Sequence, residues 1–226
     1  MIYAIGDLHL DFTKEKTMEV FGEKWINYEE KIFKNWEFIN DDDLVLIPGD
    51  FSWANDIEAA YIDLKRIDSL SGTKILTKGN HDYWWNSLSK LRKLDLKTIK
   101  FIQNDSISYD GLNICGIRGW LDPTNKDFKE ADEKIFKREL IRADMSLSSV
   151  KNDKDIVMMM HYPPFDKEKQ TNDLFTLLKK YKVTDLVYGH LHGLGHANIV
   201  EGKIDGINVK CVSSDYIDFK PVLIRS

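Results

Sequence analysis

Short apolar runs along the chain stop abruptly at polar clusters that contain glycine, proline or histidine. Apolar runs of this length, bounded by turn residues, are typical of strands that are buried on both faces of a sheet. The runs that end in this way are therefore predicted to be strands, and they cover residues 2–5, 44–47, 74–76, 156–160 and 186–188.

Between these strands, apolar residues recur at spacings of three and four, which predicts helices with one apolar face. The predicted helices cover residues 18–39, 54–70, 84–94, 128–147 and 172–181. The first of them is rich in aromatic residues. Its apolar face is expected to cover a sheet, with a dimer face as the alternative.

Strands that alternate with helices in the first half of the chain indicate βαβ units with parallel pairing. The second half departs from this pattern. Residues 107–109 and 112–115 flank Asp110-Gly111 and predict a hairpin, while residues 209–212 and 222–224 predict further strands. We therefore expect an α/β fold with a mixed, two-sheet architecture rather than one open parallel sheet.

The size and composition of the chain fit a single domain. Its 226 residues are 42% hydrophobic, and no linker, repeat or low-complexity tract divides them. α/β domains often reach this length without splitting, so residues 1–226 are expected to form one domain. No apolar run approaches the roughly 18 residues of a membrane span, and no basic leader precedes an apolar segment, so neither a membrane anchor nor a signal peptide is predicted.

The cysteines and the net charge limit which cellular compartment and which partners are expected. Cys115 and Cys211 lie in apolar, strand-like surroundings, which favours buried reduced thiols in a reducing cytoplasm, with a disulfide as the alternative. The net charge is −5, and acidic and basic residues are mixed along the chain. A nucleic-acid partner is not expected, because a polyanion-binding surface normally carries a basic excess. Bound cations can nevertheless make a site locally positive inside an acidic protein.

The histidines point to the chemistry, because five of the six follow predicted strands. Loops at the carboxyl ends of strands in α/β sheets are where ligands gather. Carboxylate and amide side chains accompany these histidines, and such a mixed nitrogen and oxygen set suits Mn, Fe or Zn. The candidate metal ligands are Asp7, His9, Asp50, Asn80, His161, His190 and His192.

Read in order, the clusters are Gly6-Asp7-Leu8-His9, Gly49-Asp50, Gly79-Asn80-His81-Asp82, His161 and Gly189-His190-Leu191-His192. This series resembles the motifs of the calcineurin-like metallophosphoesterase superfamily, and it extends from residue 6 to residue 192. The resemblance implies a four-layer αββα sandwich, in which two mixed β-sheets are flanked by helices, and a pair of metal ions at one edge.

The resemblance also implies a role for each motif residue. The first metal would be held by Asp7, His9 and His192. The second would be held by Asn80, His161 and His190, with Asp50 bridging both ions. His81 would lie near the leaving-group oxygen, oriented by Asp82. Some members carry a further aspartate three residues after the bridging one, but Trp53 stands there in this chain and supplies no ligand.

Two divalent or trivalent ions are thus the expected cofactors, with Mn favoured and Fe, Zn, Ni or Co as alternatives. Ions roughly 3.5–4 Å apart lower the pKa of a shared water and neutralise phosphoryl oxygens. The resulting hydroxide would attack phosphorus, and a protonated His81 would donate to the departing alkoxide. The predicted substrate is a phosphate monoester or diester of a small molecule, with a nucleotide or cyclic nucleotide among the candidates.

Two alternatives use the same residues differently. A nuclease would share the metal site but would bring a basic groove or extra domains, and neither is visible. A protein-recruiting scaffold of this fold would lack several ligands, whereas this chain keeps them all. Taken singly, a Gly-Asp pair is more often a helix cap or a turn, and His161 could simply end a strand. Together, these ordinary interpretations require independent coincidences in the same order.

Several residues near the motifs have an open role. His196 lies outside the motifs and is read as a loop residue, with contact to the substrate as the alternative. Arg118 follows a predicted strand and either reaches a phosphate or serves the structure. The aromatic residues beside the metal motifs either line a pocket or pack the core; they are Trp53, Tyr83, Trp84 and Trp85. The choice between monoester and diester, the native metals and the oligomeric state are not given by the sequence.

Overall fold

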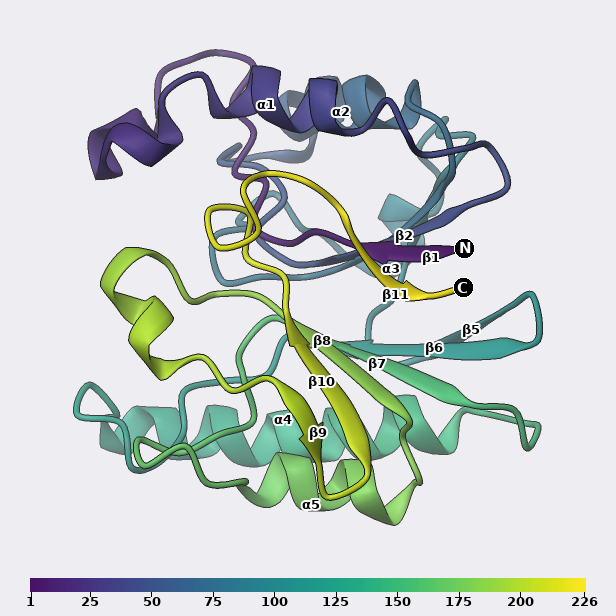
Figure 1. The fold of residues 1–226 in the computed structure, drawn as a ribbon, viewed down its shortest axis with the longest axis vertical. Helices are drawn as coiled ribbons and strands as arrows, with labels where there is room; N and C mark the ends of the chain where they lie inside the picture. The colour runs from purple at the N-terminus through teal and green to yellow at the C-terminus, as the bar shows by residue number, and fades with distance from the viewer.

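A computed structural model describes residues 1–226, in which two β-sheets stack face to face (Figure 1). The first sheet has the strand order β11-β1-β2-β3-β4. Strands β1 to β4 run parallel to one another, whereas β11 pairs antiparallel with β1. The bounds are Ile2–Ala4 (β1), Leu44–Pro48 (β2), Thr73–Thr77 (β3), Ile99–Phe101 (β4) and Val222–Arg225 (β11).

The second sheet has the strand order β5-β6-β7-β8-β10-β9. Its inner strands β6, β7, β8 and β10 are parallel, and its edge strands β5 and β9 are antiparallel to their neighbours. The bounds are Ser106–Tyr109 (β5), Leu112–Ile117 (β6), Ile156–Met160 (β7), Asp185–Tyr188 (β8), Gly202–Ile204 (β9) and Ile207–Cys211 (β10). Both sheets are therefore mixed, as the sequence predicts.

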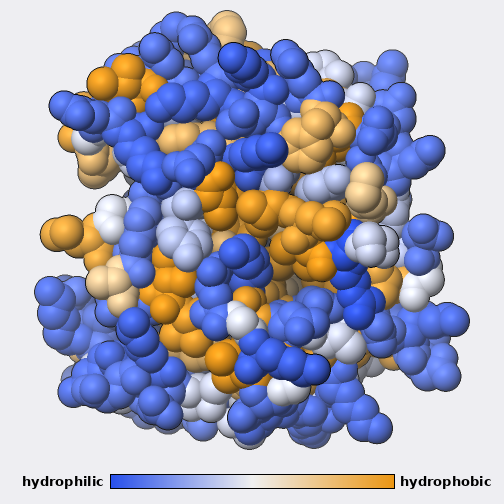
Figure 2. All heavy atoms as spheres, in the orientation of Figure 1, coloured by the Kyte–Doolittle hydropathy of each residue, from blue (hydrophilic) through white to orange (hydrophobic).

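Helices cover the outer face of each sheet (Figure 1). The helices α1 (Tyr28–Asn35) and α2 (Ile57–Asp68) cover the first sheet, and α4 (Glu130–Ser148) and α5 (Asp173–Lys180) cover the second. A short helix, α3 (Leu88–Leu91), follows β3. The predicted four-layer αββα sandwich is confirmed. In Figure 2, hydrophobic residues gather between the two sheets, whereas the outer layers are mostly hydrophilic.

Alternation along each strand divides the core into layers. In β1, Ile2 and Ala4 face the second sheet, whereas Tyr3 faces the helices. In β7, Val157 and Met159 pack between the sheets, and their neighbours pack against α4 and α5. Because successive side chains point to opposite faces, a continuous apolar run is what a strand buried on both faces requires.

The predicted helix over residues 18–39 is broken into three pieces. Two 3-10 turns, η1 (Met18–Phe21) and η2 (Glu23–Trp25), precede α1. Gly22 has φ 128° and Asn27 has φ 54°, and neither value is compatible with a continuous right-handed helix. The apolar spacing thus identified the buried faces of α1, but not the breaks before it.

Other boundaries also differ from the prediction. The helix expected over residues 84–94 is reduced to α3, because Trp84 and Trp85 pack into the core from an irregular segment. The helices expected over residues 54–70, 128–147 and 172–181 are present with ends shifted by a few residues. Strands β4 and β9 and the 3-10 segment η3 (Gly193–Asn198) were not predicted, since each is short.

Both cysteines, Cys115 and Cys211, are free and buried, which confirms the simpler interpretation of their sequence context. Burial raises the pKa of each thiol to about 12. They therefore stay protonated and pack as small apolar side chains. None of the helices has the length and apolar character that a membrane crossing requires.

Lys74, in β3, carries a charge into the core of the protein. Lys74 is fully buried. Its ammonium group donates to the carbonyl oxygen of Leu70 and to Thr98 Oγ1, the latter at 3.1 Å. Burial lowers the pKa of Lys74 from 10.5 to about 8, and the carboxylate of Asp68 only partly opposes this shift. The folded protein therefore binds this proton more weakly than the unfolded chain does.

This difference makes stability depend on pH. Between the folded and unfolded pKa values the unfolded state holds more protons, so the free energy of unfolding rises with pH. From about pH 7.5 to about pH 9.5, Lys74 should contribute a rise of roughly 1–2 kcal/mol. Lys74→Met should lack this rise in urea denaturation, whereas Lys93→Met, at an exposed position, should follow the unmodified protein. Parallel pH curves for Lys74→Met and the unmodified protein would contradict the prediction.

Candidate metal centre

The predicted metal ligands meet where the parallel strands end. Strands β1, β2 and β3 finish at one edge of the first sheet, and β7 and β8 finish at the corresponding edge of the second. The two sheets are joined at this edge. The backbone N–H of His190 donates to Asp7 Oδ2 at 2.9 Å, and Gly6 forms a parallel bridge with Ser213. Loops from both sheets therefore supply one site.

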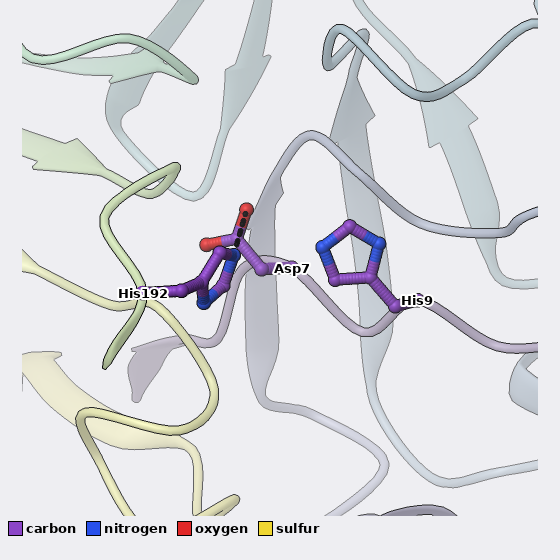
Figure 3. Close-up of side chains that lie close together, drawn as sticks. All are labelled: Asp7, His9 and His192. Carbon is purple, nitrogen blue, oxygen red and sulfur yellow. Dashed lines mark ion pairs between the residues drawn. The ribbon is translucent and has the colours of Figure 1, made fainter. Parts of the chain in front are cut away.

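A first group of ligand atoms is formed by Asp7, His9 and His192 (Figure 3). Their donor atoms lie within 4.8 Å of one another, and His192 Nε2 lies 3.6 Å from Asp7 Oδ1. Asp7 and His9 are almost fully buried. Nε2 of His192, the ring nitrogen that faces Asp7, has no hydrogen-bond partner. Buried nitrogen atoms of this kind are costly unless something binds them.

His192 is held by a residue that the motifs do not include. Its Nδ1 lies 2.8 Å from Asp215 Oδ1, and the backbone N–H of Gly193 donates to Asp215 Oδ2 at 3.0 Å. A carboxylate that accepts from one ring nitrogen leaves the other free to bind a metal, which is the usual arrangement around metal-bound histidine. His196 Nε2 also lies 3.1 Å from Asp215 Oδ2. Sequence analysis missed Asp215, although it follows a predicted strand as the other acids do.

A second group is formed by Asn80, His161 and His190. Asn80 Oδ1 lies 2.6 Å from His161 Nε2 and 3.1 Å from His190 Nδ1, and the two ring nitrogens are 3.3 Å apart. His161 Nδ1 lies 3.2 Å from the carbonyl oxygen of Pro48. Donation from Nδ1 leaves a lone pair on Nε2, which then faces the amide oxygen. Two acceptors this close repel each other unless one cation binds both.

Asp50 lies between the two groups. Its Oδ2 is 3.7 Å from His9 Nε2 and 3.4 Å from His161 Nε2. Its Oδ1 accepts a hydrogen bond of 2.8 Å from the backbone N–H of His81. One carboxylate therefore faces a histidine of each group. This is the geometry that a bridging ligand needs.

The electrostatics of the site favour neutral imidazoles and an added cation. Burial lowers the pKa of His161 to about 4, and burial together with neighbouring histidines lowers the pKa values of His9 and His190 well below their usual range. Burial and the negative charges of Asp82 and Asp7 raise the pKa of Asp50 well above its usual range. The carboxylates of Asp50, Asp82 and Asp7 thus repel one another in this buried pocket. Added divalent cations would relieve that repulsion.

The pKa of His192 is raised, in contrast to those of the other histidines at the site. Burial lowers its pKa, but the carboxylates of Asp7 and Asp215 outweigh this effect and raise it to about 10. In turn, burial raises the pKa of Asp7, and the neighbouring histidines, His192 foremost, outweigh burial and hold it below its usual range. A cation bound between these two side chains would take the place of that proton. The residues present therefore fit a metal at this position.

The backbone at the site is strained. Four of the site residues are in the left-handed region, with φ values of 56°, 46°, 51° and 75° for Asp7, His9, Asp50 and His190 respectively. Such conformations are costly for residues other than glycine, and they cluster at functional sites. Close approach explains two of the motif glycines. A Cβ atom on Gly79 would collide with Asp50, and one on Gly189 would collide with the carboxylate of Asp7.

Asp82 holds the loops rather than the neighbouring ring. Its Oδ2 accepts from the backbone N–H groups of Gly79 and Asp50 at 2.7 and 2.9 Å. Its Oδ1 accepts from the N–H groups of Phe51 and Ser52 and from the indole of Trp84. No hydrogen bond joins this carboxylate to the imidazole of His81, whose Nδ1 is unpartnered. The sequence analysis expected Asp82 to orient His81, and the structure shows no hydrogen bond that would do so.

His81 faces a cavity beside both ligand groups. Its ring lies 4.5 Å from the ring of Trp53 and 5.8 Å from that of His9, measured between centroids. The cavity has a volume of about 270 Å³ and also contacts Asp50, His190 and His192. The structure thus places His81 in the space where a ligand of the metal centre would lie.

The residues of open role separate into two classes. Trp53 lines the cavity, whereas Trp84 is buried and donates to Asp82. Arg118 lies 3.7 Å from Glu139 and stacks over Trp120 at 4.3 Å, and it does not line the cavity. Arg118 therefore packs among residues of the fold and does not reach the cavity. Trp85 is buried and Tyr83 is exposed, and neither lines the cavity.

Solved structures share this fold. The crystal structure of a protein of unknown function, AQ665 from Aquifex aeolicus, has a TM-score of 0.53 and 18% identity, over 98% of this chain and 94% of that chain. The phosphopantetheinyl hydrolase PptH from Mycobacterium tuberculosis has a TM-score of 0.57 and 13% identity, over 99% of this chain and 96% of that chain. No curated protein matches the sequence.

The sequence itself matches a family. The model of the calcineurin-like phosphoesterase family matches residues 1–194, a span that contains all of the predicted ligands. This family is metal-dependent, and the side chains at the strand ends include groups that could hold a metal ion. The chain therefore belongs to the calcineurin-like phosphoesterase family and is a hydrolase that acts on phosphate esters.

Proposed function

We propose that this protein hydrolyses a phosphate monoester or diester of a small molecule at a dinuclear metal centre. The observation that carries the proposal is the position of Asp50, whose one carboxylate oxygen faces His9 on one side and His161 on the other. In this proposal one metal is held by Asp7, His9 and His192, the second by Asn80, His161 and His190, and Asp50 bridges them. Residues 1–226 act as one catalytic domain.

The fold supports two of the proposed histidine ligands. Asp215 Oδ1 lies against Nδ1 of His192, and the carbonyl oxygen of Pro48 lies against Nδ1 of His161. When bound, a pair of divalent ions supplies an activated water and neutralises the charge on the phosphoryl oxygens. Mn is favoured for a mixed set of imidazole, carboxylate and amide ligands, with Fe, Zn, Ni or Co as alternatives.

His81 is proposed to move the proton of the leaving group. Its ring faces the cavity, and its backbone N–H is fixed by Asp50. Burial lowers the pKa of His81, although the carboxylate of Asp7 opposes this. The negative charge of a bound ester opposes this lowering. In its protonated form the ring of His81 donates to the departing alkoxide oxygen.

The alternatives receive less support from the structure. A nuclease would need cationic side chains along the substrate path, and no lysine or arginine lines the cavity at the site. A non-catalytic scaffold would have no use for a complete set of converging ligands. The name of the structural neighbour PptH, a phosphopantetheinyl hydrolase, is consistent with a small phosphoester as substrate. Free buried cysteines are consistent with a cytoplasmic location.

The dinuclear proposal predicts metal-dependent turnover that fails in two variants. Metal-stripped protein supplied with Mn should hydrolyse chromogenic phosphate mono- or diesters. His81→Ala should lower kcat by about 10²–10⁴-fold through loss of the proton donor. Asp50→Asn should lower it further, because one substitution weakens the binding of both ions. Asp153→Asn, at an exposed position, is the control. Unchanged turnover in His81→Ala would contradict its assigned role.

Asp82 should act by positioning the loops. In Asp82→Asn an amide nitrogen replaces one oxygen and faces N–H donors, so roughly 1–3 kcal/mol of unfolding free energy should be lost. Because the loop of Asp50 is then less constrained, Mn affinity should fall as well, by about 10–100-fold. Trp84→Phe, which removes one of the donors to Asp82, should show a smaller loss of both. Denaturation and calorimetric Mn titration measure the two effects, and unchanged Mn affinity in a folded Asp82→Asn would refute this role.

Asp215 should tune the metal affinity of the first group through His192. Asp215→Ala removes the acceptor of the ring proton, and Mn affinity should fall by about 10–100-fold. Asp215→Asn keeps an oxygen toward Nδ1 and should retain most of the affinity. Calorimetric titration with Mn tests the pair. Equal affinities for Asp215→Ala and the unmodified protein would show that His192 needs no support.

A further inference from the structure

The cavity at the metal centre is apolar on one side. Ligand residues form one wall, and the opposite wall comes from η1, η2 and the segment after β2. It has a volume of about 270 Å³ and is lined by His9, Met18, Phe21, Trp25, Asp50, Trp53, His81, His190, His192 and Gly193. This volume is near the lower end for ligand pockets, which run from about 300 to 1,000 Å³. A small molecule, or one end of a larger one, fits it.

The apolar wall is formed by η1 and η2, the two short turns that replace the first part of the helix predicted over residues 18–39. Gly22 turns the chain between η1 and η2, and Thr17 Oγ1 accepts from the backbone N–H of Glu19 at the start of η1. Trp25 is buried, with its ring 5.5 Å from that of His192 and 5.1 Å from that of Phe219. The wall is therefore anchored against a proposed metal ligand.

The outer part of this wall is apolar and exposed. Phe21, which lines the cavity, is 67% exposed, its chain neighbour Val20 is 76% exposed, and Leu194 is 97% exposed. Leu194 follows Gly193, which lines the cavity from η3. In Figure 1, η1 (dark purple) and η3 (yellow-green) project on the same side of the molecule. Exposed apolar residues gathered at the mouth of a cavity mark a binding surface.

The charged groups around the cavity further limit which ligands it accepts. No lysine or arginine lines it, so beyond the histidines only the metal ions would offer positive charge to a substrate. A single phosphate group satisfies those ions. A second phosphate or a carboxylate would lie against apolar side chains without a partner, which is unfavourable.

From this geometry we infer that the substrate is an ester with one phosphate group, whose remaining part is aromatic or otherwise apolar and uncharged. The inference rests on the proposed function, because the phosphate is placed at the metal centre. The apolar part lies against Phe21, Met18 and Trp25, and Trp53 beside His81 supplies a further aromatic face. Rings of this kind contact a ligand ring by stacking or by edge-to-face packing.

Non-hydrolysable phosphonates test this arrangement without requiring turnover. Phenylphosphonate and methylphosphonate share one head group and differ only in the apolar part. Calorimetric titration of Mn-loaded protein should give a dissociation constant about tenfold lower for phenylphosphonate. A third compound, 4-carboxyphenylphosphonate, carries a second charge against the apolar wall and should lose most of this advantage.

Variants locate the effect. Phe21→Ala should reduce the ratio of the two dissociation constants, because the phenyl group loses a contact that the methyl group does not reach, while Phe21→Leu should keep part of the ratio. Phe21 is largely exposed, so the fold does not depend on it. Phe38→Ala is the matched control, since Phe38 is 39% exposed, packs on Tyr3 and does not line the cavity.

The outcomes separate this inference from the proposed function. Equal binding of phenylphosphonate and methylphosphonate, in protein that hydrolyses esters with Mn, would overturn the inference and leave the proposed function standing. A preference that survives in Phe21→Ala would overturn the assigned wall. Absence of Mn-dependent binding of either phosphonate, together with absence of hydrolysis, would overturn both.

Discussion

The site depends on one buried carboxylate, that of Asp82. Burial raises its pKa, and four backbone N–H groups and an indole stabilise its charged form. These donors come from the loops after β2 and β3, so one side chain fixes two strand ends relative to each other. Asp50 can keep a left-handed backbone and face both histidine groups only because its loop is held in this way. The cost of burying the charge is offset by hydrogen bonds to nearly every accessible lone pair.

Much of the candidate site could be predicted from sequence because its residues follow directly after parallel strands. Parallel strands end at one edge, and the polar residues that directly follow them must meet there. Asp7, Asp50 and His161 could be placed in this way. Asp215 could not, since it lies beyond the motif series and reaches His192 only through tertiary proximity. The same limit applies to Asp82, because spacing places it beside His81 but does not say which way its carboxylate points.

The segment before α1 shows where periodicity fails. Spacings of three and four residues identify apolar positions, but they do not identify what those positions contact. In residues 18–25 the apolar side chains divide between the core, where Trp25 is buried, and the cavity mouth, where Phe21 is exposed. A continuous helix could not point them in both directions. The local departure from helical geometry therefore coincides with the apolar wall of the cavity at the candidate metal centre.

The pairing of β11 with β1 has a consequence for how the protein is made. It joins residues 222–225 to residues 2–4, so the outer edge of β1 lacks its partner strand until residues 222–225 have been synthesised. An unpaired edge is a template for association with other chains, so the nascent protein is exposed to wrong pairing at β1 until β11 forms. Asp215 lies in the same late segment. A translation product that stops before it would carry every motif histidine and still lack the support of His192.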